Sequence, residues 1–202
     1  DDVSSSSSSS SSLSLSMPLA SCVSSSSQVM AFGIGANDAS NSWATTVGSG
    51  ALSLRSAVWI GAVAEFLGAV TLGAGVAKTI QGTSDIKDPR CWACGYCDSR
   101  MSSYLGGMFA ALVATALFLL LATFTAMPVS TTHAVVGGVV GVTVVGTSGR
   151  GGGGGRCLNW AYDGGLTGIA ASWVVSPILA GVVAVGCYTI TNVLIIGGAG
   201  GG

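Results

Sequence analysis

Long apolar runs alternate with short polar segments along most of the chain. The apolar runs are residues 57–77, 104–126, 128–147 and 164–196, and a partial run covers 29–50. A helix that spans a membrane needs about 20 mostly apolar residues. Residues 101–149 and 164–202 also lack Asp, Glu, Lys and Arg. The pattern therefore predicts an all-α, polytopic integral membrane protein.

Polar residues and prolines interrupt three of these runs. Asn37, Asp38 and Asn41 lie inside the run 29–50, which favours a broken first helix and only a partial span. Pro128 should stop the preceding helix and suits the first turn of the next one. The last run is about one and a half spans long, so we expect a break at Pro177.

The segments outside the runs differ in composition. Residues 1–28 are rich in serine, which predicts low-complexity, disordered sequence. Residues 78–103 form a charged loop that contains cysteines, and residues 148–163 form a glycine-rich, flexible loop. Lys and Arg are too few and too scattered to orient the spans by loop charge.

The composition excludes some classes of function. Charged residues make up 7% of the chain and the net charge is −1, so there is no basic surface for nucleic acid. Membrane lipid is the expected surrounding partner. Ser130 and His133 lack the Gly-x-Ser-x-Gly turn of a hydrolase. We therefore expect neither an enzyme nor a bound cofactor.

Acidic and amide side chains within apolar runs are candidates for cation binding. Asn37, Asp38 and Asn41 supply hard oxygen ligands, and together with unwound backbone they could hold Na⁺ or H⁺. Alternatively, Asn37 and Asp38 cap a helix that starts near Ala39. Glu65 lies within the run 57–77, where a carboxylate is protonated or paired with a cation. Its alternative role is a hydrogen bond between helices.

Hydroxyl side chains after Pro128 are candidates for anion binding. Ser130, Thr131 and Thr132 stand at an expected helix start, where free N–H groups and the helix dipole can hold phosphate or sulfate. An ordinary Ser/Thr cap explains the same residues. His133 is the only histidine, and it could equally sense protons or form a hydrogen bond between helices.

Four cysteines lie in the two polar loops. Cys91, Cys94 and Cys97 follow a zinc-like spacing, and Cys157 is a distant fourth. This is a weak zinc signal. A disulfide explains them at least as well if both loops face an oxidising compartment.

Three segments resemble the signature segments of the PiT family of inorganic phosphate:cation symporters. They are GANDASNSWATTVGSGAL (35–52), MPVSTTHAVVGGVVG (127–141) and SWVVSPILAG (172–181). The resemblance implies a multi-pass protein, in the plasma membrane, made of two inverted repeats around one site, each with a broken first helix and a hairpin-like region. It implies that Asn37, Asp38 and Asn41 help to bind the cation and the substrate, and that residues 130–132 bind phosphate. It also favours a disulfide over zinc.

Each signature occurs once, and serine-rich sequence stands where the first helix should begin. We therefore expect the N-terminal repeat of a longer transporter that carries phosphate together with Na⁺ or H⁺. The second repeat would come from missing sequence or from an antiparallel second copy. The alternatives are a sulfate transporter of the same family and a half-length membrane subunit that does not transport.

Overall fold

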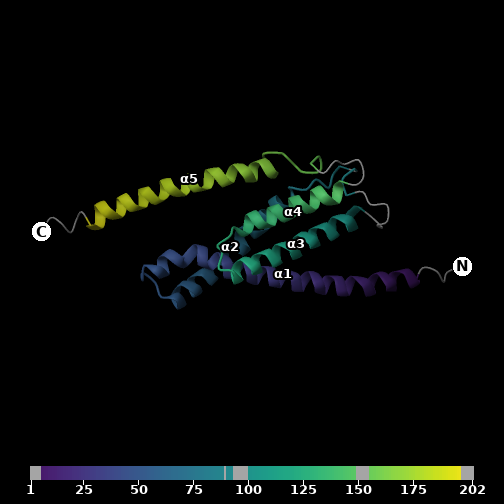
Figure 1. Cartoon of the computed structure of the whole chain (residues 1–202), viewed down its shortest axis with the longest axis horizontal. Helices are drawn as coiled ribbons and strands as arrows, with labels where there is room; N and C mark the ends of the chain where they lie inside the picture. Colours follow the sequence, from purple (N-terminus) through teal and green to yellow (C-terminus); the bar gives the residue numbers. More distant parts are fainter. Residues whose placement is uncertain (1–5, 89, 93–99, 149–154, 197–202) are drawn as a thin grey trace. The chain divides into compact units, whose positions relative to one another are not determined.

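A computed structural model describes residues 6–88, 90–92, 100–148 and 155–196 (Figure 1). These residues form five α-helices and a terminal π-helical turn: α1 (Ser6–Gly48), α2 (Leu54–Gln81), α3 (Arg100–Phe124), α4 (Thr131–Thr147), α5 (Leu166–Thr191) and η1 (Asn192–Ile196). Within them, the only β-type pairing is an isolated bridge between Ser84 and Leu158. The predicted all-α class is confirmed.

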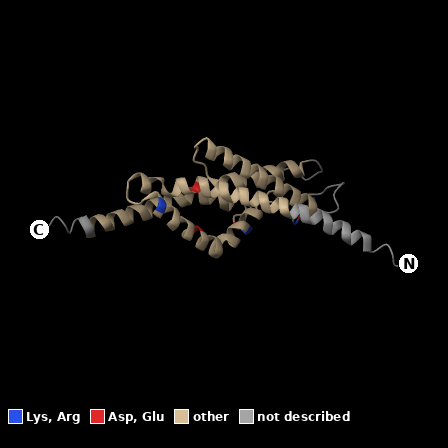
Figure 2. Ribbon diagram, turned by 90° about the horizontal axis from the view of Figure 1, so that it is seen from below, with Lys and Arg blue, Asp and Glu red and all other residues tan. Residues whose placement is uncertain are grey.

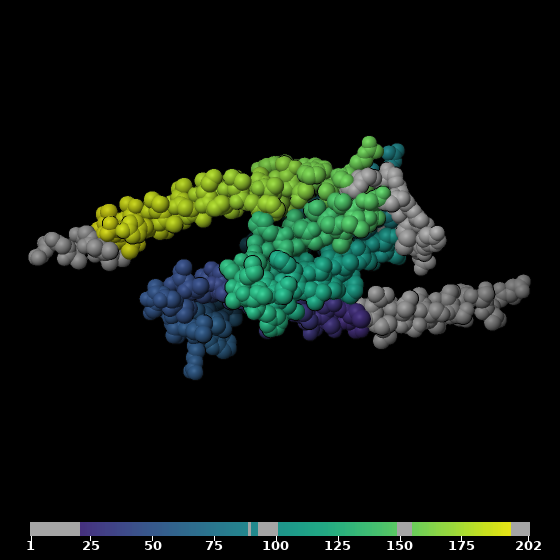
Figure 3. All heavy atoms as spheres, in the orientation of Figure 1, coloured from purple at the N-terminus to yellow at the C-terminus, as the bar shows by residue number. Residues whose placement is uncertain are grey.

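The chain divides into two compact units, Asp1–Leu158 and Asn159–Gly202. In the first unit, α3 packs against both α1 and α4, whereas α2 makes smaller contacts with α1 and α4. Figure 3 shows α3 and α4 in close contact, and a small core of Leu119, Val136 and Thr143 lies among the helices. In the second unit, the Leu166 N–H at the start of α5 donates to the Asn159 carbonyl at 2.8 Å.

Three of the described helices are long and apolar enough to cross a membrane, namely α2, residues 101–124 of α3, and residues 166–194. The fourth apolar helix, α4, is shorter. Large apolar side chains on α2 and α5 are exposed, Phe66 and Val182 among them, as expected where lipid replaces water. Figure 2 shows how few charged residues the ribbon carries. These are the features of a multi-pass membrane protein.

The prediction of a broken first helix is wrong, because α1 continues through Asn37, Asp38 and Asn41. Their side chains find partners on the α3–α4 side of the unit, so the backbone does not need to unwind. The helix also begins at Ser6 and so extends into residues 1–28, where composition predicts disorder. There the Ser27 hydroxyl donates to the Val23 carbonyl within the helix, a bond compatible with helical backbone.

The two prolines also act differently from the predictions. Pro128 lies in the linker between α3 and α4 and not in the first turn of α4, which begins three residues later at Thr131, with Ser130 as its N-cap. Pro177 lies inside α5, which continues to Thr191 without the expected break. A proline removes one backbone donor, and membrane helices tolerate this loss when the neighbouring turns remain bonded.

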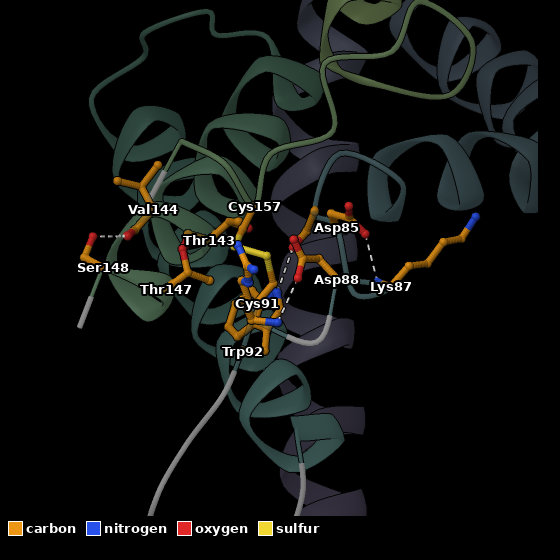
Figure 4. The surroundings of a disulfide bond; sticks show 12 residues. Asp85, Lys87, Asp88, Cys91, Trp92, Thr143, Val144, Thr147, Ser148 and Cys157 are labelled. Atoms are coloured by element: carbon orange, nitrogen blue, oxygen red, sulfur yellow. Dashed lines mark hydrogen bonds between the residues drawn. A yellow bond between two sulfur atoms is a disulfide. The ribbon is translucent and has the colours of Figure 1, made fainter. Parts of the chain in front are cut away.

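A disulfide between Cys91 and Cys157 joins the two polar loops near the ends of α3 and α4 (Figure 4). The Asp85 N–H donates to the Cys157 carbonyl at 2.7 Å beside it. Trp92 is 2% exposed, and its indole N–H donates to the Ser84 hydroxyl at 3.0 Å. The bonds in this cluster tie the loop that follows α2 to the segment that follows α4.

Two glycines make room for the Trp92 ring. A Cβ added at Gly107 on α3 would lie 2.5 Å from the ring, and one at Gly146 on α4 would lie 3.0 Å from it. The ring also meets Tyr104 edge to face, with centroids 5.4 Å apart. Trp92 therefore wedges between α3 and α4 and fixes their separation at this end.

We expect Gly107→Ala to lower the thermal unfolding midpoint of the purified protein, because the new methyl group must displace the buried Trp92 ring. Overpacking of this kind costs about 1–3 kcal/mol. The control is Gly106→Ala, which adds the same methyl group at the neighbouring position, where no atom outside the helix lies within 4 Å. Equal midpoints for the two variants would contradict the wedge.

Candidate functional site

The polar residues of α1 lie on two adjacent faces of the helix. Asn37 and Asn41 are one turn apart and both contact the linker between α3 and α4. Asp38 is the next residue round the helix, and it lines a cavity on the side of α2. One turn of α1 therefore contributes to two different environments.

Asn37 is 3% exposed and fully hydrogen-bonded. Its amide nitrogen donates to the Met127 carbonyl at 3.1 Å and to the Thr123 hydroxyl at 3.5 Å. Its amide oxygen accepts from the Val129 N–H at 3.1 Å and from the Asn41 side chain at 3.4 Å. A primary amide has two donor hydrogens and two acceptor lone pairs. Asn37 would thus have to give up a bond before its side-chain oxygen could bind a cation.

Asn41 completes the contact with the linker. Its side-chain nitrogen donates to the Val129 carbonyl at 3.1 Å. Both main-chain groups of Val129 are then bound by α1, the N–H by Asn37 and the carbonyl by Asn41. The linker with Pro128 is thereby held against α1, and this places the first residue of α4.

Asp38 meets α4 directly. The Thr131 hydroxyl donates to Oδ2 of Asp38 at 2.8 Å, and Thr131 is buried. This bond joins the two sets of residues that the sequence singled out for cation and for anion binding. It also puts a carboxylate beside the N-terminal end of α4, where the helix dipole favours negative charge.

The other hydroxyls at the start of α4 behave differently from one another. The Ser130 hydroxyl accepts from the His133 N–H at 3.4 Å, as an N-cap does, and lies 2.5 Å from His133 Nδ1. Ser130, Thr132 and His133 are exposed at this helix end. The cap that the sequence offered as an alternative is therefore present at Ser130, and it leaves Thr132 on the open surface.

The cavity between α1 and α2 has a volume of about 660 Å³. Asp38, Ser42 and Trp43 line it from α1, and Gly61 and Glu65 line it from α2. The two carboxylates singled out for cation binding thus share one cavity. Asn37 and Asn41 line a second cavity of about 570 Å³ with Thr123 and Met127.

The cysteines are only partly covered by the structure. Cys91 pairs with Cys157, as the disulfide interpretation allows, whereas Cys94 and Cys97 lie outside the described residues. Among the residues with described positions, no group of three or more His, Cys, Asp or Glu side chains could hold a metal ion.

Sequence reasoning missed several residues of the site. The main chain of Met127 and Val129 carries no side-chain signal, although Asn37 binds it. Gly61 could have been found, because it stands four residues before Glu65 and so lies on the same face of α2. For Trp43, the only sequence signal of a functional role is its place in the signature segment 35–52.

The fold and the site define a class of protein: a multi-pass, all-helical membrane protein in which one helix places a carboxylate on the start of another helix and amides on the linker before it. Residues 34–198 match the family model described as the phosphate transporter family. The chain therefore belongs to the phosphate transporter family.

Similar proteins carry related names. A protein of Mycobacterium bovis, "Putative phosphate permease Mb2302", is 39% identical over 161 residues, which are 76% of this chain and 26% of that protein. One of Pyrococcus furiosus, "Putative phosphate permease PF1020", is 38% identical over 159 residues, 77% of this chain and 34% of that protein. The chain thus spans about a quarter to a third of these relatives. No solved structure matches it.

We expect Asn37→Ala to destabilise the first unit, because it removes the hydrogen bonds that the buried Asn37 side chain makes with the main chain of Met127 and Val129. Each such hydrogen bond contributes about 0.5–1.5 kcal/mol. Thermal unfolding in detergent measures the effect. Ser40→Ala is the matched control, since the Ser40 hydroxyl bonds only to the Asn37 carbonyl of its own helix. A midpoint for Asn37→Ala equal to that of the control would refute the role of Asn37.

Proposed function

We propose that this chain supplies one repeat of a transporter that carries inorganic phosphate together with a cation. The observation that carries the proposal is the 2.8 Å hydrogen bond from Thr131 to Asp38. It joins a carboxylate suited to a cation to a helix start suited to an oxyanion. Membership of the phosphate transporter family and relatives named as phosphate permeases support phosphate as the substrate.

Coupling between the two ions follows from electrostatics. An ionised Asp38 occupies the N-terminal side of α4, so it opposes any phosphate that approaches Ser130 or Thr132. Two like unit charges about 5 Å apart repel by on the order of 3 kcal/mol at an effective dielectric constant of about 20. A cation bound beside Asp38 cancels this repulsion, and by reciprocity the bound anion strengthens cation binding.

The cation site that fits this scheme is the cavity between α1 and α2. Asp38 and Glu65 both line it, and a carboxylate within an apolar span favours a cation or a proton as its partner. Asn37 and Asn41 then serve to hold the α3–α4 linker, and through it Ser130 and Thr131, in place. His133 beside Ser130 is the group we assign to proton sensing.

In this proposal the second half of the site comes from other residues, either the rest of a longer chain or another copy. Half a substrate shell binds weakly, so the test measures binding to the repeat rather than uptake. Binding of radiolabelled phosphate to the purified chain in lipid nanodiscs, with sodium or with choline at fixed pH, separates sodium dependence from proton dependence.

We expect sodium to strengthen phosphate binding by about tenfold or more, which corresponds to a coupling of about 1.4 kcal/mol or more. In Asp38→Asn the charge that repels phosphate is gone, so binding should become independent of sodium. Asp85→Asn is the control, because Asp85 lies in the loop that carries the disulfide and bonds the Lys87 N–H.

Three results would count against the proposal. If phosphate binding by Asp38→Asn still depended fully on sodium, Asp38 would not couple the two ions. Sulfate that displaces phosphate at equal concentration would make sulfate a substrate of the same site. An absence of any saturable anion binding would leave the repeat as a subunit that does not transport.

A further inference from the structure

Trp43 of α1 rests directly on the backbone of α2 at Gly61. A Cβ added at Gly61 would lie 2.9 Å from Nε1 of Trp43 and 3.5 Å from Cε2. Real side chains do not approach a ring that closely without a shift of one or the other. The indole edge therefore uses the space that only a glycine leaves open, and the two helices are held at the separation this contact allows.

The contact lies in the wall of the cavity that holds Asp38 and Glu65. Gly61 and Glu65 are one turn apart on α2, and Trp43 and Asp38 both face the cavity from α1. Each carboxylate is carried by a different helix, so the distance between them depends on how closely α1 and α2 approach. Of the glycines that line this wall, Gly61 is the one that a side chain of the facing helix approaches most closely.

We propose that Trp43, seated on Gly61, is a positioning residue that sets the width of this cavity and thereby its preference for a small cation. The inference rests on the proposed cation site at Asp38 and Glu65. A small cation gains most when oxygen ligands from both helices reach it at once, and a wider cavity favours a larger or more hydrated ion. A side chain at position 61 must push the indole into the cavity or push the helices apart, and either change alters the spacing of the carboxylates.

The same contact makes Trp43 a spectroscopic reporter. Its ring shares the cavity with both carboxylates, so a cation bound between them changes the electric field at the indole. The emission change on adding sodium should be absent in Trp43→Phe. A cavity that binds no sodium predicts no such change.

The test compares Gly61→Ala with Gly68→Ala in the full chain, purified in lipid nanodiscs. Both add one methyl group to α2, but a Cβ at Gly68 meets nothing within 4 Å. Saturable binding of radiolabelled sodium, with potassium as competitor, gives affinity and preference. We expect Gly61→Ala to weaken sodium binding by about tenfold, as do changes that disturb the shell around metal ligands. It should also reduce the preference over potassium, while Gly68→Ala binds as the unmodified chain does.

Trp43→Phe provides a second variant that does not depend on how Gly61→Ala folds. The smaller phenylalanine ring fills less of the space above Gly61, so the preference for sodium over potassium should fall, as it does in Gly61→Ala. An unchanged sodium preference in Trp43→Phe, or equal sodium binding by Gly61→Ala and Gly68→Ala, would overturn the inference. The proposed function would survive either result as long as Asp38→Asn lowers sodium binding. No saturable sodium binding by the unmodified chain would sink the inference and the cation site together.

Discussion

The side-chain amide of Asn37 is the contact on which the first unit depends. It lies in the middle of a helix, it is buried, and it satisfies main-chain groups of a linker about 90 residues further along the chain. Polar backbone in an apolar setting must find partners within the protein. Because Asn37 and Asn41 supply them, α3 and α4 can be joined by a short linker with a proline, and α4 begins beside α1.

That geometry decides where the charges lie. Asp38 follows Asn37 directly on α1, so it meets α4 at Thr131 and faces the α1–α2 cavity as well. Glu65 lines the same cavity from α2. Trp43 of α1 packs against Gly61 of α2 in the wall of this cavity. An apolar environment strengthens the interactions between charges. The arrangement therefore links a carboxylate, a helix start and a cavity within one turn of α1.

The sequence predicted the helical membrane class, because long charge-free runs favour lipid over water. It also singled out Asp38 and Thr131 as candidate binding residues, and the structure brings these two side chains together. It did not predict how they meet. Asn37 and Asp38 suggested an unwound helix, yet α1 is continuous, because the partners that remove the need to unwind lie in residues 123–131 and contribute main-chain groups as well as side chains. Pro177 likewise suggested a break, because a proline disrupts an isolated helix. However, α5 continues through it, since the neighbouring turns of the helix keep their hydrogen bonds. The Cys91–Cys157 disulfide forms because two distant loops meet in the fold. The spacing of the cysteines along the sequence does not show which loops meet.

In the proposed mechanism, Asp38 and Thr131 act as one unit between the cation and the anion. A double-mutant cycle with Asp38→Asn and Thr131→Val, read out as the sodium stimulation of phosphate binding, tests it most directly. If the two side chains act together, the double variant loses no more stimulation than Asp38→Asn alone, with an interaction free energy of about 1 kcal/mol or more between the two positions. Strictly additive losses would contradict it, because they would mean that the two side chains act independently.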